Sequence, residues 1–285
     1  MPTVIYAIVL GGLPYLGVVI VITLLGLREF YGLLEDKGAH PLAAYGMAAG
    51  AALPVVAYIG NEYHATLILT ATMIGVMMSA VGRAQIGEAL ASISGTFMGV
   101  FYVGWLLAHA VVLRNFHDAA SSKYGAAAID AVGIAPESGI FFMLFCLVCV
   151  VWSDAGAYFA GRAWGKRKLA RRISPGKTVE GAVGGVVAGT VAALITKGIF
   201  DLAWPELSAA LHWGPAVVMG LVVAVVAIVG DLAESLMKRD AQTKDAGHLL
   251  PGMGGVLDRI DSPLLGIPVM YYMLLLYVFL KVESR

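Results

Sequence analysis

Residues 214–233 read GPAVVMGLVVAVVAIVGDLA, and this stretch carries no charged residue before Asp231. A continuous run of about 20 apolar residues, with a rise of about 1.5 Å per residue, crosses the hydrocarbon core of a membrane as an α-helix. The stretch therefore predicts a transmembrane helix that ends on an acidic residue.

Further apolar runs of similar length lie on both sides of this stretch. The 285 residues are 59% hydrophobic and 13% charged, whereas an average soluble domain carries about 25% charged residues. A soluble fold could not bury so much apolar surface, so we expect an all-α, polytopic membrane protein. Eight helices are expected, and a break in the fifth at Ser153-Asp154 would make nine. Their ranges are 3–25, 41–59, 65–81, 92–113, 139–160, 180–200, 214–233 and 263–281.

The sequence shows no internal repeat and no low-complexity linker, which predicts a single integral membrane domain over residues 1–285. Residues 1–140 supply N-terminal transmembrane helices with few polar groups. Residues 141–285 supply the C-terminal helices and the charged segments, so the chemistry is expected there. Gly181, Gly185 and Gly189 recur at four-residue spacing, a pattern typical of close helix packing.

The distribution of Lys and Arg predicts the orientation of the helices, because cytoplasmic loops collect these residues. When the N-terminus is placed outside, most of the 19 Lys and Arg fall in inner loops, chiefly 161–179 and 234–262. Both termini are therefore expected outside, with the charged loops facing the cytoplasm.

Acidic residues at the ends of the expected spans indicate a functional site, because a carboxylate in or near hydrocarbon is costly. Asp154 closes the fifth span and Asp231 the seventh, while Asp258 and Asp261 precede the eighth. The three-residue spacing of the last two puts them on one helix face, and Asp231 and Glu234 share that spacing. Clustered carboxylates suit Mg²⁺, which binds them together with substrate phosphates. The alternative is that these acids only cap helices and pair with nearby bases.

The basic loop after the fifth span has two parts. The bases of residues 162–172 are explained by attraction to anionic headgroups. The next stretch, SPGKTVEG at 174–181, is different. Pro175-Gly176 predicts a turn, and the sixth helix begins directly after it. The free N–H groups of that helix start, with Lys177 beside them, would suit a phosphate.

Residues 235–261 read SLMKRDAQTKDAGHLLPGMGGVLDRID and combine bases, acids and exposed backbone. Lys238 and Arg239 end an amphipathic helix, and a Gly/Pro loop then leads into the last span. Glycines in that loop let an anionic ligand approach the backbone closely. Phosphoryl and nucleotidyl transfer use these same kinds of groups.

This segment resembles the signature of the phosphatidate cytidylyltransferases. The spacing holds throughout, at Ser235, Lys238, Arg239, Lys244, Asp245, Pro251, Gly252, Gly254, Gly255, Asp258, Arg259 and Asp261. Met253 stands where the family usually has His, which favours a role in loop shape or nucleotide contact over proton transfer. Three further segments are similar to the family: 154–161, 174–181 and, in its glutamate-containing first loop, Arg28-Glu29-Phe30-Tyr31.

The resemblance implies a reaction in which CTP and phosphatidic acid give CDP-diacylglycerol and pyrophosphate at a bacterial-type inner membrane. The attacking phosphate is already largely ionised, so the reaction needs charge neutralisation and alignment more than a strong base. Expected ligands of Mg²⁺, alone or with a second cation, are Asp231, Asp258 and Asp261, with Asp154 as a fourth. Lys238 and Arg239 are expected to be catalytic together with the first three of these acids.

Phosphate groups of the substrates are expected to bind Lys177, Lys238, Arg239, Lys244 and Arg259. Further substrate contacts are expected at Ser174, Glu180, Ser235, Asp245, Gly254 and Gly255. The two serines are expected to cap helices or to donate to phosphate rather than to act as nucleophiles.

Two alternatives stay open. A polyprenol kinase that uses CTP would share the nucleotide, although the long signature favours cytidylyl transfer. An ion-coupled transporter would use intramembrane carboxylates, but transporters often show repeats and broken helices at the bilayer midplane. The expected partners are CTP, phosphatidic acid, the bilayer and a second copy of the chain, given its glycine-rich helix faces. No nucleic acid is expected.

Overall fold

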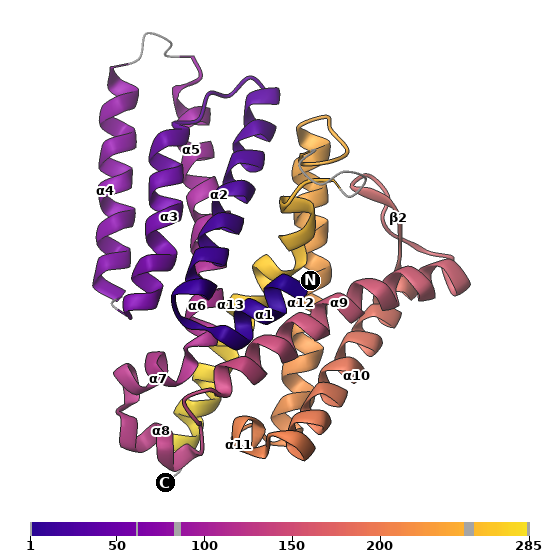
Figure 1. Ribbon diagram of the computed structural model, residues 1–285. Helices are drawn as coiled ribbons and strands as arrows, with labels where there is room; N and C mark the ends of the chain where they lie inside the picture. The colour runs from indigo at the N-terminus through magenta and orange to yellow at the C-terminus, as the bar shows by residue number, and fades with distance from the viewer. Residues whose placement is uncertain (1, 61, 83–86, 248–253, 284–285) are drawn as a thin grey trace. The chain divides into compact units, whose positions relative to one another are not determined.

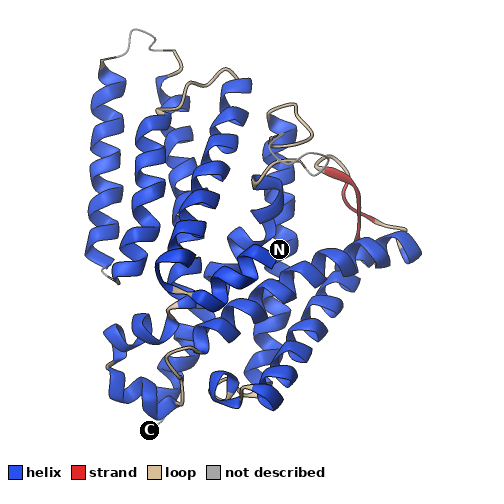
Figure 2. Ribbon diagram, viewed as in Figure 1, coloured by secondary structure: helices blue, strands red, loops and turns tan. Residues whose placement is uncertain are grey.

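The computed structural model describes residues 2–60, 62–82, 87–247 and 254–283, and these are almost entirely helical (Figure 2). Seven helices in these ranges are long and apolar enough to cross a membrane. They are Gly12–Asp36, Tyr63–Val81, Ala89–Arg114, Ser138–Trp164, Val179–Ala203, Trp213–Asp240 and Leu257–Glu283. A shorter apolar helix spans Ala43–Ile59. The predicted all-α, polytopic membrane protein is confirmed, whereas the count of eight or nine spans is not.

The first expected span consists of two helices, α1 (Pro2–Leu10) and α2 (Gly12–Asp36). The helix is interrupted at Gly11 and Gly12, whose φ angles of 64° and 55° favour glycine. Helix α9 (Ser138–Trp164) runs unbroken through Ser153-Asp154, so the break considered there is absent. The interruption therefore lies in the first span and not in the fifth.

The chain forms two compact units. Unit 1 contains residues 1–10, 112–235 and 261–285, and unit 2 contains residues 11–111 and 236–260. Helices α12 (Trp213–Asp240) and α13 (Leu257–Glu283) each contribute to both units. The expectation that residues 1–285 form one integral membrane domain stays a prediction.

Unit 1 is built around α9 and α10 (Val179–Ala203), which lie side by side (Figure 1). A Cβ atom at Gly185 would lie 2.7 Å from the Ser153 carbonyl oxygen, and one at Gly189 would lie 2.7 Å from that of Cys149. The glycine face of α10 therefore packs against α9, and close helix packing is confirmed. Because α9 covers this face, it offers no surface to a second copy of the chain.

The remaining elements of unit 1 are short. They are α1, α7 (Phe116–Tyr124), α8 (Ala126–Val132), β1 (Lys168–Ala170), β2 (Ser174–Thr178) and α11 (Pro205–Ser208), together with the end of α6 (Leu106–Arg114).

Strands β1 and β2, which directly precede α10 in the chain, pair antiparallel. The turn between them lies at residues 171–173, so the turn predicted at Pro175-Gly176 is wrong. Proline has no N–H to donate, but it is tolerated in an edge strand, and both strands of a two-stranded sheet are edges. Helix α10 does begin directly after β2, as predicted. The Thr178 hydroxyl caps it by accepting the Gly181 N–H at 3.1 Å.

Unit 2 packs α2 against α3 (Ala43–Ile59), with α4 (Glu62–Val81), α5 (Ala89–Gly99) and the π-helix η1 (Val100–Trp105) beside them (Figure 1). The Tyr31 hydroxyl donates to the Thr96 carbonyl at 3.0 Å. Gly46 and Gly99 leave room for the Tyr31 ring, since a Cβ at either would lie within 2.5 Å of a ring or hydroxyl atom. These contacts fix the rotation of α2 and thereby the direction of the residues around position 29.

Candidate active site

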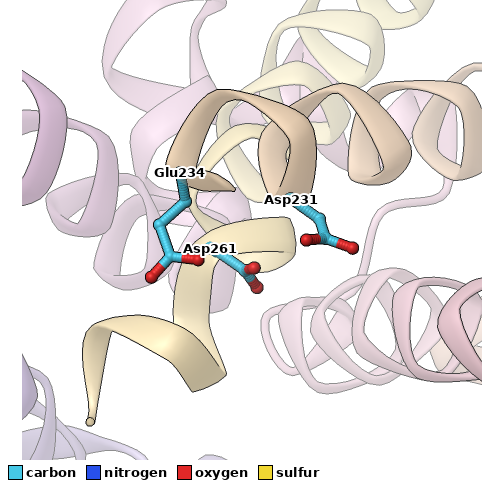
Figure 3. A group of neighbouring side chains, drawn as sticks. All are labelled: Asp231, Glu234 and Asp261. Carbon is cyan, nitrogen blue, oxygen red and sulfur yellow. The ribbon is translucent and has the colours of Figure 1, made fainter. Parts of the chain in front are cut away.

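Three carboxylates from α12 and α13 converge in unit 1 (Figure 3). One oxygen each of Asp231, Glu234 and Asp261 lies within 4.8 Å of the other two. The three-residue spacing on α12 places the first two on one helix face. Gly230 lets α13 approach, because a Cβ there would lie 2.6 Å from the Asp261 carbonyl oxygen. Glu234 is fully buried and Asp261 nearly so, whereas Asp231 is partly exposed.

This acidic trio has the donor chemistry of a divalent-cation site. Buried carboxylates at this separation repel one another and lose hydration, so they favour a compensating cation. Carboxylate oxygens are the ligands that Mg²⁺ and Ca²⁺ prefer. Two of the four expected ligands, Asp231 and Asp261, belong to the trio. Glu234 is a third whose spacing was visible in the sequence but which had no assigned role.

Asp154 and Lys177 lie beside the trio. The Lys177 Nζ atom is 2.5 Å from the Asp231 Oδ2 atom. The Ser262 hydroxyl donates to Asp154 Oδ1 at 3.4 Å, and the Ser262 N–H donates to Asp261 Oδ1 at 2.6 Å. Ser262 thus connects Asp154 to Asp261 of the trio, and Lys177 places a positive charge next to Asp231.

A cavity of about 430 Å³ opens in unit 1 between the end of α9, β2, α10 and α12. Its polar lining includes Asp154, Arg162, Ser174, Lys177 and Asp231, and its apolar lining includes Ala157, Leu169 and Ile228. The cavity therefore combines positive charge, acids and an apolar wall. A ligand with an anionic head and an apolar tail requires such a combination.

The two expected serines do not cap helices. Ser174 lines the cavity from β2, and Thr178 caps α10 in its place. The Ser235 hydroxyl donates to Asp231 Oδ1 at 3.5 Å within α12, so it orients a member of the trio.

Glu180 is bonded to the chain itself. Its carboxylate accepts the N–H groups of Lys166 at 3.0 Å and Arg167 at 3.1 Å, and the Arg167 side chain at 3.1 Å. In this structure it fastens the segment before β1 to the start of α10.

In unit 2, Asp258 ties together the two ends of the signature loop. Its carboxylate accepts the N–H of Ala246 at 3.1 Å and that of Gly255 at 2.7 Å, and it receives Lys238 Nζ at 2.6 Å. Gly254 has a φ angle of 81°, and a Cβ there would lie 2.7 Å from Asp258 Oδ2. Asp258 is therefore paired with Lys238 and holds the described ends of the loop, at Ala246 and Gly255, and the trio does not include it.

The other expected phosphate ligands lie around a second cavity of unit 2, of about 650 Å³. Lys244 and Asp245 are exposed and line it, together with Arg28. The Arg239 guanidinium donates to the Thr243 carbonyl at 3.2 Å, and Arg259 is exposed. Pro251, Gly252 and Met253 lie outside the described residues.

Glu29 was expected in a loop, but it lies inside α2. It is 6% exposed, and its two oxygens accept the N–H groups of Val256 and Leu257. The charged pair Arg28-Glu29, directly after the apolar run of the first expected span, was the signal in the sequence. Its partners could not be inferred, because they lie more than 200 residues away in the chain.

Acids and bases lie near the ends of helices that are long and apolar enough to cross a membrane. This arrangement is typical of membrane-embedded proteins that act on phosphate groups. The chain belongs to the cytidylyltransferase family, whose sequence profile matches residues 1–277. The family predicted from the signature segment is therefore confirmed.

Individual relatives agree. The chain is 33% identical over 281 residues to a phosphatidate cytidylyltransferase of Synechocystis sp., a match covering 94% of this chain and 91% of that protein. It is 42% identical over 142 residues to the phosphatidate cytidylyltransferase of Bacillus subtilis, and this match covers 50% of each chain. It is 47% identical over 128 residues to that of Pseudomonas aeruginosa, covering 45% of each.

Proposed function

We propose that the protein transfers the cytidylyl group of CTP to phosphatidic acid and thereby makes CDP-diacylglycerol in phospholipid biosynthesis. The observation that carries the proposal is the acidic trio, because its member Asp231 pairs with Lys177 and both line a cavity that also has an apolar wall. The name of the Synechocystis relative, which matches 94% of this chain, supports the same reaction.

The reaction balances without an added acid or base. A phosphate oxygen of phosphatidic acid attacks the α-phosphorus of CTP and forms a new P–O bond. The bond from the α-phosphorus to the oxygen that bridges to the β-phosphate breaks, and pyrophosphate leaves with that electron pair. Because the attacking monoester is already ionised, the chain has to neutralise charge and align the two phosphates.

Mg²⁺ fits the donor set of the trio, and when bound it stabilises negative charge on the reacting phosphates. Asp231, Glu234 and Asp261 would hold it, and Asp154 is proposed as a fourth ligand. A second cation stays a prediction. Asp258 is proposed to act on the loop that it organises, because its carboxylate already accepts Lys238 and two backbone N–H groups.

The lipid phosphate is proposed to enter the cavity of unit 1 and to bind Lys177, with Ser174 as a hydrogen-bond donor. Tyr158 and Trp164 near the end of α9 are largely exposed, and aromatic residues of this kind favour the depth of lipid headgroups. The CTP triphosphate is proposed to bind Lys238, Arg239, Lys244, Arg259 and the glycine backbone at 254–255. Glu180, Ser235 and Asp245 would support these contacts.

The bias of Lys and Arg supports a cytoplasmic position for these groups in a bacterial-type inner membrane. A homodimer stays a prediction, and the glycine face of α10 does not contribute to it.

The test uses the purified protein with phosphatidic acid in detergent micelles and CTP labelled in cytosine, with and without Mg²⁺. We expect label in a chloroform-soluble lipid only with Mg²⁺. Asp231→Asn should lose this activity, and Glu206→Gln, at an exposed acid of α11, should keep it. Transfer of the γ-phosphate to a polyprenol, with no label in the lipid, would instead support the kinase alternative. CTP that is never consumed would favour transport.

A further inference from the structure

Glu29 is a buried carboxylate beside the cavity of unit 2 that Arg28 and Lys244 also line. It is 6% exposed, and its helix neighbours Leu27 and Phe30 are 0% and 3% exposed. Burial of an ionised carboxylate is costly unless hydrogen bonds or opposite charge compensate for it. The partners of Glu29 therefore indicate what the residue does.

These partners are backbone groups at the start of α13. Glu29 Oε1 accepts the Val256 N–H at 3.0 Å, and Oε2 accepts the Leu257 N–H at 2.7 Å. The first N–H groups of a helix have no partner within the helix, and the positive end of the helix dipole favours an anion there. Glu29 thus caps α13 from a distant part of the sequence.

Two glycines of the signature segment lie against the same carboxylate. A Cβ at Gly247 would be 2.5 Å from Glu29 Oε1, and one at Gly255 would be 2.4 Å from Oε2. Neither position can carry a side chain while Glu29 stays in place. The segment therefore approaches α2 closely on both sides of its loop.

Asp258 also binds this segment, because its carboxylate accepts the N–H groups of Ala246 and Gly255. The two carboxylates together fix residues 246–247 and 255–257. From this geometry we infer that Glu29 is a positioning residue for the reaction. It holds the signature segment in the conformation that aligns Asp258 and its partner Lys238. The inference rests on the proposed function.

The test replaces Glu29 by Gln and by Asp in the full chain. Glutamine offers only one accepting oxygen and no charge, and aspartate is one methylene too short to reach both N–H groups. Misplacement of a reacting group by about 1 Å can cost about 100-fold in rate, so we expect kcat to fall about 10- to 100-fold in Glu29→Gln. Glu88→Gln, at an exposed acid of the same unit, is the control and should keep the wild-type kcat.

Hydrogen exchange supplies a readout that general destabilisation would not reproduce. In Glu29→Gln the amides of residues 255–257 should exchange faster, while those of α10 keep the wild-type rate. Gly247→Ala should displace the carboxylate and slow the reaction by the same route. The double variant should then be no slower than the slower single variant, because both changes break one contact.

Three results would overturn the inference. A wild-type kcat in Glu29→Gln would show that the contact is not needed for alignment. A lower KM for CTP with unchanged kcat would show that Glu29 occupies a phosphate site which CTP must clear. Multiplicative effects in the double variant would show that Gly247 acts independently of Glu29. If the wild-type protein transfers no cytidylyl group, the proposed function fails, and the exchange rates at 255–257 still test whether Glu29 holds the segment.

Discussion

The Lys238–Asp258 pair should contribute far more to stability than a second Lys–Asp pair in unit 2. The side chains of Lys238 and Asp258 are 13% and 11% exposed, and their closest atoms are 2.6 Å apart. The pair of Lys37 and Asp240 also uses an α12 residue, but its side chains are 44% and 61% exposed. Removal of one partner from a buried pair costs about 3–5 kcal/mol, because the other charge is left buried, whereas exposed pairs contribute about 0–1 kcal/mol.

Asp258→Asn should therefore lower the free energy of unfolding by about 3 kcal/mol. Its carboxylate also accepts two backbone N–H groups. Their loss should let the loop open locally and hydrate Lys238, which keeps the loss of unfolding free energy near the lower end of the range. Asp240→Asn should cost less than about 1 kcal/mol.

The assay is unfolding in detergent micelles, followed for the single variants Asp258→Asn and Lys238→Met and for the double variant. Neighbours in one network show coupling energies of about 0.5–3 kcal/mol, and we expect a value in the upper half of that range here. The same cycle with Asp240→Asn and Lys37→Met should give coupling near zero. Equal losses in Asp258→Asn and Asp240→Asn would refute the argument from burial.

Three further predictions concern unit 1. Gly185→Ala should destabilise the α9–α10 contact by about 1–3 kcal/mol through overpacking. Gly198→Ala, whose Cβ would meet only Trp213 at 3.5 Å, should be neutral or stabilising by up to about 1 kcal/mol. Thermal unfolding measures both variants. Thr178→Ala should cost about 1 kcal/mol through loss of the α10 cap, measured in the same way. Lys177→Met should raise the KM for phosphatidic acid about 10- to 100-fold, which corresponds to one charged hydrogen bond of about 1.5–3 kcal/mol, and should leave the KM for CTP within about twofold. Equal effects on both KM values would contradict the assignment of Lys177 to the lipid phosphate.

The helices were predictable because long apolar runs have few alternatives to crossing a membrane. The candidate ligands Asp231 and Asp261 were also predictable, since an acid at the end of an apolar helix is costly enough to indicate function. Their separation was not predictable, because it depends on how closely α13 approaches α12 at Gly230. The same approach brings Glu234 into the trio.

Contacts between distant parts of the sequence could not be predicted. The turn predicted at Pro175-Gly176 is wrong for a local reason. Both residues are common in turns, yet here they lie within β2, between the residues Ser174 and Thr178 that pair with β1. The role of Glu29 has a non-local cause. No spacing rule relates a residue of α2 to the N–H groups of Val256 and Leu257.

The most direct measurement is the rate of cytidylyl transfer to phosphatidic acid by Glu234→Gln, across a range of Mg²⁺ concentrations. Glu234 is the member of the trio that the structure alone assigns, and its variant keeps the size of the side chain. If the trio holds the cation that the reaction uses, loss of one carboxylate should raise the Mg²⁺ concentration for half-maximal rate by about 10- to 100-fold. An unchanged rate and an unchanged Mg²⁺ requirement would contradict the placement of the reaction at Asp231, Glu234 and Asp261.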